Sequence, residues 1–467
     1  MKYKLLAFFI LLLGIFLFNQ PTQAATFDPN NIISDIEILD YTAMDLADIK
    51  EFLTNKGSYL AGYSCANADG VMMTTAEIIY DRATTNKVNP KFLLVLLQKE
   101  QSLIEKTSPS QNQLDWATGY GCPDGGSCNP RWQGFWKQIN SASLQFRDYM
   151  DNPQLYTYKA GGTYTFTNPY GTISQEPTIV TPVNQATAGL YNYTPHVYNG
   201  NYNFYKIWQR YFTRSYFDGS LLQAQGEVGV WLIQDGKKRP FLSKGALTSR
   251  FDIKKVIQVN KSDLDKYETG APIKFAQYSL IRSPRGTVFL LVDDKKRGFT
   301  SGEAFRKMGF NPTEVIDASW DDINVYSNGV PITATSTYPT GALLQNKITG
   351  GVYWVIEGTK APLIDRIFLS TKFSKKKIIP TSQEELAVYQ TIDPILFGDG
   401  ELLKSNLSSS VFVISEGKKR AIISAKIFEQ LGYKWENIIT VSPKILYLYA
   451  EGDPIMEVIP AISELDQ

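Results

Sequence analysis

Apolar residues recur every three to four positions along much of the first half of the chain, which is the spacing of helices with one buried face. Once a leading apolar segment is set aside, this pattern predicts helices over residues 43–56, 75–87, 90–106, 130–151, 183–192 and 202–213. Residues 155–182 are instead rich in Thr, Tyr, Gly and Pro, which indicates a hairpin or a long surface loop. We therefore expect a mainly helical region over residues 26–216.

After that region the apolar positions alternate over short stretches, and the sequence repeats itself. Residues 229–239 (GVWLIQDGKKR) recur as 287–297 (TVFLLVDDKKR) and 410–420 (SVFVISEGKKR), with a weaker copy at 351–360 (GVYWVIEGTK). Matching Pro-Ile pairs close the copies, beginning at Pro272, Pro331, Pro394 and Pro454. Repetition at a regular period is typical of an array of small structural units.

Each copy follows the same order of patterns. An alternating strand reaches a tight turn and a short return strand, and a helix and a β-branched strand follow. A serine stands at the expected start of the helix in three copies (Ser243, Ser301 and Ser424). The predicted fold is therefore multidomain. A mainly α region is followed by four small α+β repeats, over residues 217–275, 276–335, 336–397 and 398–467.

Two features of the repeats have alternative interpretations. The Lys-Lys-Arg run after the hairpin turn is suited to binding an acidic cell-surface polymer, because several weak contacts add through avidity. The alternative is solvated charge at a hairpin tip. Aromatic residues at one equivalent strand position are expected in the core, with a ligand platform as the alternative (Trp231, Phe289, Tyr353 and Phe412).

The first residues have the layout of a secretory leader. Lys2 and Lys4 precede an unbroken apolar stretch over residues 5–18, and Thr22-Gln23-Ala24 offers a cleavage site. The stretch is short for a membrane-spanning helix, which needs about 20 residues, so we expect a cleaved signal peptide over residues 1–24. The alternative is an uncleaved membrane anchor. Both place the bulk of the chain outside the cytoplasm, secreted or at the cell envelope.

Composition narrows the chemistry that is open to the chain. Hydrophobic residues make up 43% of its 467 residues, enough for packed cores. The net charge of +1 becomes −1 without Lys2 and Lys4 (45 basic against 46 acidic residues), which gives no electrostatic case for nucleic acid. His196 is the only histidine, so multi-histidine metal centres are excluded, and we expect no metal and no cofactor. Carboxylates are left as the expected catalytic groups.

The cysteines agree with an oxidising compartment. Cys122 and Cys128 flank a turn-rich stretch that is suited to a small disulfide loop, which leaves Cys65 over, although sequence alone does not fix the pairing. A Cys–His peptidase would have to use His196. Neither Cys65 nor Cys122 stands in a recognisable nucleophile motif, so we do not favour that chemistry.

One predicted helix carries the main candidate for catalysis. Asn89 and Pro90 are suited to its cap and first turn, and the helix is apolar almost all round, so we expect it to be buried. On helical spacing Glu100 has only apolar neighbours (Leu96, Leu97, Leu103 and Ile104). A desolvated carboxyl group holds its proton, as a proton donor to a glycosidic oxygen must. The alternative is a structural glutamate paired with a buried arginine or with backbone amides. Glu105 is expected to be solvated.

Three segments together resemble a known family. Residues 98–102 (QKEQS), 117–121 (ATGYG) and 190–195 (LYNYTP) follow the order and rough spacing of the Gln-Glu-Ser, Gly-Leu-Met-Gln and Ala-Tyr-Asn-Ala-Gly-Pro motifs of the lysozyme-like soluble lytic transglycosylases. The resemblance covers residues 40–216, and the chain departs from the motifs at Gln101, Tyr120-Gly121 and Tyr193-Thr194. It implies a lysozyme-like domain that cleaves the β-1,4 bond between N-acetylmuramic acid and N-acetylglucosamine, with Glu100 as general acid and then base.

The resemblance also implies the groups around Glu100. The substrate-binding residues would be Gly119, Tyr120, Trp116, Tyr191 and Asn192, with ordinary packing as the alternative for the last two. A 1,6-anhydro product needs one carboxylate, because a substrate hydroxyl group is the nucleophile. Hydrolysis ordinarily needs a second carboxylate, for which Asp115 is the candidate, although a cap or turn role is expected for it. Trp132 and Trp136 are further candidates for stacking on sugars, with core packing expected for most of these tryptophans.

Two functions from different classes follow. The first is a secreted peptidoglycan-cleaving enzyme that binds glycan strands and is held at the cell envelope by its repeats. The second is a non-catalytic glycan-binding or surface-attachment protein. Glu100 favours the enzyme, since a pure binder needs no acid on an apolar stripe, while the length of the repeats keeps the binder open. Contact with a membrane is expected only if the leader stays attached.

Overall fold

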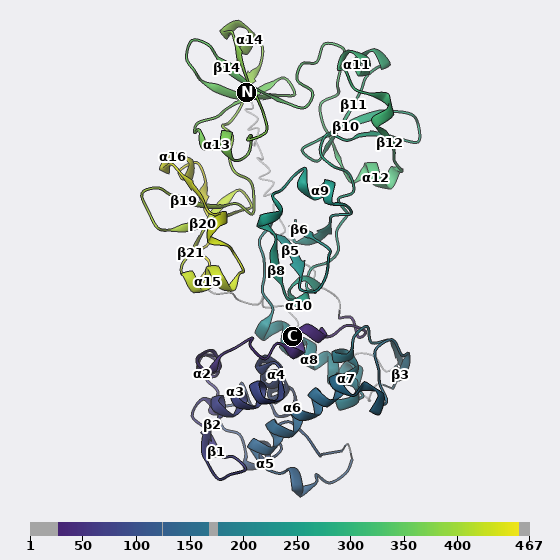
Figure 1. Ribbon diagram of the computed structural model, residues 1–467, viewed down its shortest axis with the longest axis vertical. Coiled ribbons are helices and arrows are strands. Elements are labelled where there is room, and N and C mark those ends of the chain that lie inside the picture. Colours follow the sequence, from purple (N-terminus) through teal and green to yellow (C-terminus); the bar gives the residue numbers. More distant parts are fainter. Residues whose placement is uncertain (1–26, 124, 168–175, 457–467) are drawn as a thin grey trace, which may run out of the picture.

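The computed structural model describes residues 27–123, 125–167 and 176–456, which form a helical region and four similar mixed sheets (Figure 1). This confirms the predicted order of an α region followed by four small α+β repeats. The predicted signal peptide over residues 1–24 lies outside the described residues. Within the described ranges, no helix is long and apolar enough to cross a membrane.

The helical region packs its helices around one core and adds two small hairpins. Its helices are α1 (Asp35–Leu39), α2 (Leu46–Asn55), α3 (Thr75–Asn86), α4 (Pro90–Gln101), α5 (Gln111–Asp115), α6 (Phe135–Asp151), α7 (Gln185–Tyr193) and α8 (Tyr202–Phe212). Its hairpins pair β1 (Ser64–Ala66) with β2 (Met72–Thr74) and β3 (Tyr164–Phe166) with β4 (Thr178–Val180). The predicted helices are present with shifted ends. The pattern missed α1, α5 and the first hairpin, because such short elements hold too few positions to show a period.

Helix α4 runs through the core of the helical region. Asn89 caps it by accepting a backbone N–H of the first turn, and Pro90 is its first residue, as predicted. Phe92 packs edge-on against Phe146 of α6 and beside Phe204 of α8, and all three rings are fully buried. The apolar surface that surrounds α4 therefore fixes the helix between its neighbours.

The end of α4 differs from the prediction, and this decides where Glu100 lies. The helix stops before Ser102, short of the predicted residue 106, because Ser102 has a left-handed backbone (φ 57°). The Gln98 side chain then accepts the backbone N–H groups of Ile104 and Glu105, so the loop after the helix is held without helical hydrogen bonds. Glu100 consequently lies in the last turn of α4, next to a loop.

The four repeats, numbered 1 to 4 along the chain, share one sheet topology. The strand order is β7-β6-β5-β8 in repeat 1, and the other three sheets keep this order and add a short fifth strand (β12-β9-β10-β11-β13, β17-β14-β15-β16-β18 and β22-β19-β20-β21-β23). Serines cap the first helix in repeats 1, 2 and 4, as predicted (Ser243, Ser301 and Ser424). The strand before each hairpin and the second short helix were not predicted.

The elements of repeat 1 are β5 (Leu221–Ala224), β6 (Trp231–Gln234), β7 (Lys237–Pro240), α9 (Lys244–Thr248), β8 (Ile257–Val259) and α10 (Lys261–Asp265). Those of repeat 2 are β9 (Leu280–Arg282), β10 (Val288–Val292), β11 (Lys295–Gly298), α11 (Gly302–Lys307), β12 (Val315–Asp317), α12 (Trp320–Asn324) and β13 (Ser327–Asn328). Those of repeat 3 are β14 (Ala342–Asn346), β15 (Val352–Ile356), β16 (Thr359–Pro362), α13 (Ile367–Ser370), β17 (Ile378–Thr381), α14 (Gln383–Ala387) and β18 (Gln390–Thr391). Those of repeat 4 are β19 (Leu402–Ser405), β20 (Val411–Ser415), β21 (Lys418–Ile422), α15 (Ala425–Gln430), β22 (Ile439–Val441), α16 (Pro443–Leu446) and β23 (Ala450–Glu451).

Most of the basic groups after the hairpin turns take part in the fold. In repeats 2 to 4 the middle lysine, or its equivalent, donates to carbonyl groups at the end of the second short helix (Lys296 to Ile323 and Tyr326, Lys360 to Leu386, Lys419 to Leu446). Arg239 and Arg297 donate to backbone carbonyls further along the chain. Solvated charge is therefore wrong for these positions, and the first lysine of the run is the exposed one in repeats 1, 2 and 4 (Lys237, Lys295 and Lys418). The equivalent aromatic residues pack, partly buried, against the cores, as expected (Trp231, Phe289, Tyr353 and Phe412).

The repeats form a closed ring that adjoins the helical region (Figure 1). Ion pairs join repeat 1 to repeat 2 and repeat 2 to repeat 3 (Arg250–Asp294 and Arg297–Glu357), and repeats 3 and 4 share an apolar cluster. The ring closes where repeat 4 returns to repeat 1. There Lys255 pairs with Glu401 at 2.6 Å, and residues of both repeats, among them Leu222 and Val413, form one buried cluster.

Candidate functional site

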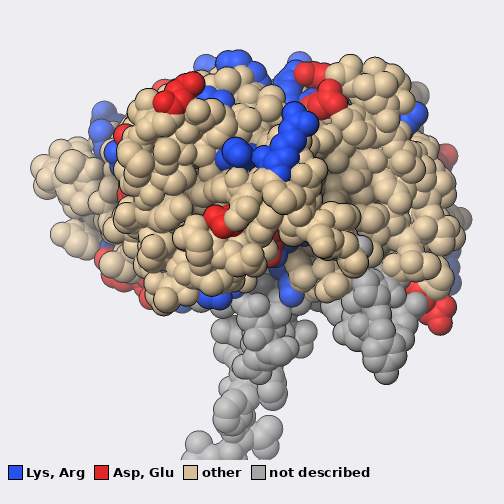
Figure 2. Space-filling view, turned by 90° about the horizontal axis from the view of Figure 1, so that it is seen from below, with Lys and Arg blue, Asp and Glu red and all other residues tan. Residues whose placement is uncertain are grey.

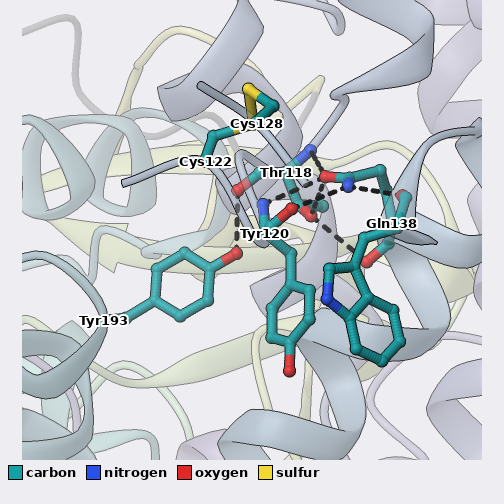
Figure 3. Close-up of a disulfide and its surroundings, with 7 residues drawn as sticks. Thr118, Tyr120, Cys122, Cys128, Gln138 and Tyr193 are labelled. Atoms are coloured by element: carbon teal, nitrogen blue, oxygen red, sulfur yellow. Dashed lines mark hydrogen bonds between the residues drawn. A yellow bond between two sulfur atoms is a disulfide. The ribbon is translucent and has the colours of Figure 1, made fainter. Parts of the chain in front are cut away.

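Three segments singled out in the sequence meet at the C-terminal end of α4. Lys99 of α4 donates a hydrogen bond to Thr194, directly after α7 (Nζ to Oγ1, 2.8 Å). Tyr193, the last residue of α7, donates from its hydroxyl group to the carbonyl of Thr118 (2.8 Å), in the turn that follows α5 (Figure 3). Residues 98–102, 117–121 and 190–195 therefore belong to one site.

Glu100 lies at the edge of this site, in partial contact with solvent. Its side chain is 22% exposed, and Oε1 forms a 2.6 Å ion pair with Lys99, whose own side chain is only 6% exposed. Gly119 lies against the other oxygen: a Cβ atom on this residue would be 3.3 Å from Oε2. Gly119 also has a φ of +69°, so the turn needs a glycine for its backbone as well as for the close approach. The carboxylate is thus held between an ammonium group and a backbone turn.

The surroundings expected for Glu100 are wrong in one respect. The neighbouring apolar side chains are buried in the core as expected (Leu96, Leu97, Leu103 and Ile104), but the carboxyl group itself pairs with Lys99. The glutamate is therefore paired, as the structural alternative anticipated, with a lysine in place of an arginine. An acid role for Glu100 cannot rest on apolar burial alone.

Tyr193 is the tyrosine beside Glu100. Burial, together with the negative charge of Glu100, raises the pKa of the Tyr193 hydroxyl group well above its usual range. This hydroxyl group therefore stays protonated and keeps its hydrogen bond to Thr118. The tyrosine contributes a neutral wall to the site and fixes the turn that carries Gly119.

Tyr191 and Asn192, which the resemblance assigned to the substrate, have roles within the fold. Tyr191 is fully buried, donates to the carbonyl of Pro29 and stacks on Phe166, with ring centroids 4.5 Å apart. The Asn192 amide holds both backbone groups of Tyr158. Both residues therefore follow the packing alternative.

A buried glutamine that sequence reasoning missed holds the turn in place. Gln138 of α6 is fully buried, and its Oε1 accepts the backbone N–H groups of Thr118 and Tyr120 (3.2 and 3.0 Å). Its Nε2 donates to the carbonyls of Tyr120 and Trp132 (Figure 3). The sequence signal that could have revealed Gln138 is a polar residue among the apolar positions of α6.

The disulfide loop supports two aromatic rings next to this turn. Cys122 and Cys128 form the disulfide (Figure 3), and the backbone N–H of Asn129 donates to the carbonyl of Gly121 across the base of the loop. A Cβ atom on Gly121 would be 2.5 Å from the Trp132 ring, so this glycine lets the ring approach the backbone. Tyr120 and Trp132 meet edge to face at 5.3 Å.

Asp115, the candidate second carboxylate, is bound by two amides. It ends α5, and its oxygens accept from Gln111 Nε2 (2.9 Å) and Gln133 Nε2 (2.8 Å). It lines a separate groove together with Cys65 and Trp136. Trp116, at the end of α5, and Trp136 are half-buried. The structure therefore gives Asp115 a role in the loop.

The cysteines agree with a structural use. Cys122 is bonded to Cys128, so it cannot be a nucleophile. Burial raises the pKa of the Cys65 thiol, which keeps it in the less reactive protonated form.

Glu105 is exposed, as expected, but its carboxylate is also bound. Its Oε1 accepts from the Tyr211 hydroxyl group (2.7 Å) and pairs with Arg210 (2.8 Å), and Gln98 donates to its other oxygen. Glu105 thus ties the loop after α4 to α8.

One family model matches part of the chain, over the helical region. Residues 31–223 match the family model described as the LasA N-terminal domain. This match corrects the lysozyme-like resemblance drawn over residues 40–216, since it assigns the same residues to a different family. None of the curated proteins matches the chain.

Solved structures show only distant likeness. The periplasmic assembly of the ESX-5 inner membrane complex aligns with 10% identity over 53% of this chain and 96% of that chain, at a TM-score of 0.13. The EccB3 dimer of the ESX-3 core complex aligns with 11% identity over 50% and 97%, at the same TM-score. Scores this low support no conclusion about fold or function.

Proposed function

We propose that the helical region cleaves the glycan strands of peptidoglycan, with Glu100 as the group that gives and takes the proton. The observation that carries this proposal is the position of Glu100, a partly exposed carboxylate where three chain segments meet. The match of residues 31–223 to the LasA N-terminal domain is compatible with a secreted, peptidoglycan-lytic protein. The leader pattern and the disulfide support export.

One carboxylate is enough for the chemistry we propose. Protonated Glu100 donates its proton to the glycosidic oxygen, the bond from that oxygen to C1 breaks, and positive charge develops on the sugar ring. The resulting carboxylate then takes the proton of the muramoyl 6-hydroxyl group as that oxygen bonds to C1. The product is a 1,6-anhydro sugar, and Glu100 regains its proton. Lys99 and Gly119 would orient the carboxylate in the steps where it carries charge.

The face of the helical region that lies opposite the ring carries few charged side chains. Figure 2 views the helical region from the end opposite the ring, and residues other than Lys, Arg, Asp and Glu cover most of that face. A nucleic-acid site would need a basic stripe. In this proposal the ring of repeats holds the enzyme at the envelope, where the exposed Lys295 and Lys418 are available to an acidic polymer.

The test is release of soluble fragments from purified peptidoglycan by the chain without residues 1–24. The unchanged chain is expected to release fragments, and Glu100→Gln is expected to release none above background. Asp69→Asn removes one exposed carboxylate from the same region and serves as the matched control. If Glu100→Gln releases fragments at the rate of the control, Glu100 is not the acid. If no chain releases fragments while all of them sediment with peptidoglycan, the non-catalytic glycan-binding function replaces the enzyme.

A further inference from the structure

A groove runs along the exposed side of α6, next to the turn that touches Glu100. It is lined mainly by Tyr120, Trp132, Asn140, Leu144, Gln145 and Asp148. Tyr120 directly follows Gly119, which lies against the Glu100 carboxylate. The groove and the candidate acid therefore share one turn of the backbone.

The aromatic end of the groove is built to stay in place. Trp132 is fixed by the Gln138 hydrogen bond to its carbonyl and by the close approach of Gly121, and the Arg131 guanidinium group lies 4.8 Å from its ring centre. Tyr120 is tied through its hydroxyl group to Gln145 (3.3 Å). Rigid aromatic groups with a polar edge are suited to the apolar face and hydroxyl rim of a sugar ring.

The polar groups of the groove carry little net charge. Arg147 is paired with Asp151 on the same helix, and Asp148 accepts hydrogen bonds from Tyr156 and Asn152. The amides of Asn140 and Gln145 are the neutral polar groups of the lining; Gln145 bonds Tyr120 and Tyr156, and Asn140 Oδ1 accepts from Arg82. Neutral amides beside aromatic rings fit an N-acetylated sugar, whereas an acidic polymer would need unpaired cations.

We propose that this groove binds the N-acetylglucosamine units of a glycan strand, with Trp132 and Tyr120 as the stacking surface and the Cys122–Cys128 loop as its support. This inference rests on the proposed function, because it places part of the same substrate beside Glu100. Leu144, which is 49% exposed, adds an apolar contact in the middle of the groove.

The test is calorimetric titration of chitotetraose into the chain without residues 1–24, carrying Glu100→Gln so that no turnover occurs. The expected result is measurable binding that Trp132→Ala weakens at least about tenfold, because one stacked ring contributes energy of that order. Tyr120→Leu is the second variant, in case loss of Trp132 disturbs the loop. Trp320→Ala is the matched control, since Trp320 is an exposed tryptophan of repeat 2, and it is expected to leave the affinity unchanged.

Two results would overturn the inference: no binding of chitotetraose to the parent chain, or equal affinity in the parent chain and in both groove variants. The outcome is separable from that of the proposed function. If binding depends on Trp132 but no fragments are released from peptidoglycan, the proposed enzymatic function is wrong and the proposed sugar-binding groove is supported. If release depends on Glu100 but the groove variants bind chitotetraose as the parent chain does, the enzymatic function is supported and the sugar-binding groove is wrong.

Discussion

At the scale of single residues, the site depends on what touches one carboxylate. Glu100 is fixed from one side by Lys99 and from the other by Gly119, and both residues belong to segments that the sequence analysis singled out. Lys99 is almost completely buried and also donates to Thr194. The ion pair therefore links the acid to α7, so the position of Glu100 is set by three segments at once.

The contact between Gly119 and Glu100 can be tested with one methyl group. Gly119→Ala places a Cβ atom 3.3 Å from Glu100 Oε2 and strains a backbone with φ +69°. We expect a loss of about 1–2 kcal/mol in the free energy of unfolding and at least about a tenfold loss of fragment release. Release from peptidoglycan and thermal unfolding are the measurements.

Gly57→Ala is the matched control, because Gly57 has a φ of +62° and no atom within 4 Å of a built Cβ. It should show the backbone cost alone, with unchanged release per folded molecule. Equal activity of the two alanine variants would mean that the position of the Glu100 carboxylate does not matter.

At the scale of elements, the sequence predicted the presence of the helices better than the residues at which they end. The period of apolar residues identified α4 and its cap, because Asn89 and Pro90 act locally. The early end of α4 depends on the Gln98 side chain, which turns back to bind two backbone N–H groups of the loop. Such a contact leaves no period in the sequence, so the predicted helix ran to residue 106 and put Glu100 in its middle.

The segments that form the candidate site could be predicted, but the orientation of their side chains could not. The three segments were recognisable and do meet, but which tyrosine of α7 faces Glu100 depends on the rotation of that helix against the core. Tyr191 is turned to Phe166 and Tyr193 to the turn at Thr118. Gln138 could not be recognised, since its partners are backbone groups that the fold brings together. In the repeats, the regular spacing of the copies predicted the four structural units. The lysines that donate to helix ends could not be predicted, because tertiary contacts bring their partners close.

The lysines of the repeats give a test at this scale. Lys419 is buried and donates to the carbonyl of Leu446 at the end of α16 (2.8 Å), while Lys418, one residue earlier, is exposed. Lys419→Met should lower the free energy of unfolding by about 1–2 kcal/mol, because a helix end loses its donor. Lys418→Ala should change it by less than about 0.5 kcal/mol. Denaturant unfolding measures both, and equal effects would show that the run is a surface charge after all.

At the scale of the whole molecule, two interfaces matter. One closes the ring between repeats 1 and 4, and the other joins the helical region to repeat 1. The ring closes where Gly219 of repeat 1 meets the backbone of Asp399 and Gly400 of repeat 4. The helical region joins repeat 1 through polar contacts, in which Asp263 Oδ1 accepts the backbone N–H of Arg214 (2.6 Å) and Ser262 donates to Glu37.

One substitution is expected to open the ring between repeats 1 and 4. A Cβ atom on Gly219 would be 2.1 Å from the Asp399 backbone, which cannot move aside as a flexible side chain would. Gly219→Ala should therefore cost about 2–4 kcal/mol, the sum of backbone strain and overpacking, and speed amide hydrogen exchange in repeats 1 and 4. Gly286→Ala in repeat 2 is the control, because its φ of +86° is similar and nothing lies within 4 Å of its built Cβ. Identical exchange in the two variants would contradict a closed ring.

The contact with the helical region should depend on pH through Asp263. This side chain is fully buried, and burial raises its pKa to about 6. Because the folded chain holds this proton more tightly than the unfolded chain, Asp263 favours folding below about pH 4, and this contribution is lost as the pH rises through 6. Asp263→Asn keeps an acceptor for Arg214 and should remove roughly 2–3 kcal/mol of that pH dependence.

Melting temperatures of the unchanged chain and of Asp263→Asn between pH 4 and 7 provide the comparison. The unchanged chain should lose stability relative to the variant as the pH rises. Two parallel curves would show that Asp263 is ionised throughout this range.

Mass spectrometry of the soluble fragments tests most directly whether Glu100 takes part in cutting a glycosidic bond. The expected fragments end in 1,6-anhydro-N-acetylmuramic acid, and they disappear with Glu100→Gln but not with Asp69→Asn. Reducing ends that disappear in the same way would keep Glu100 as the acid and would show that water, in place of the 6-hydroxyl group, attacks C1. Fragments with intact glycan strands and cut peptides, released equally by the Glu100→Gln chain, would contradict a role of Glu100 in glycan cleavage.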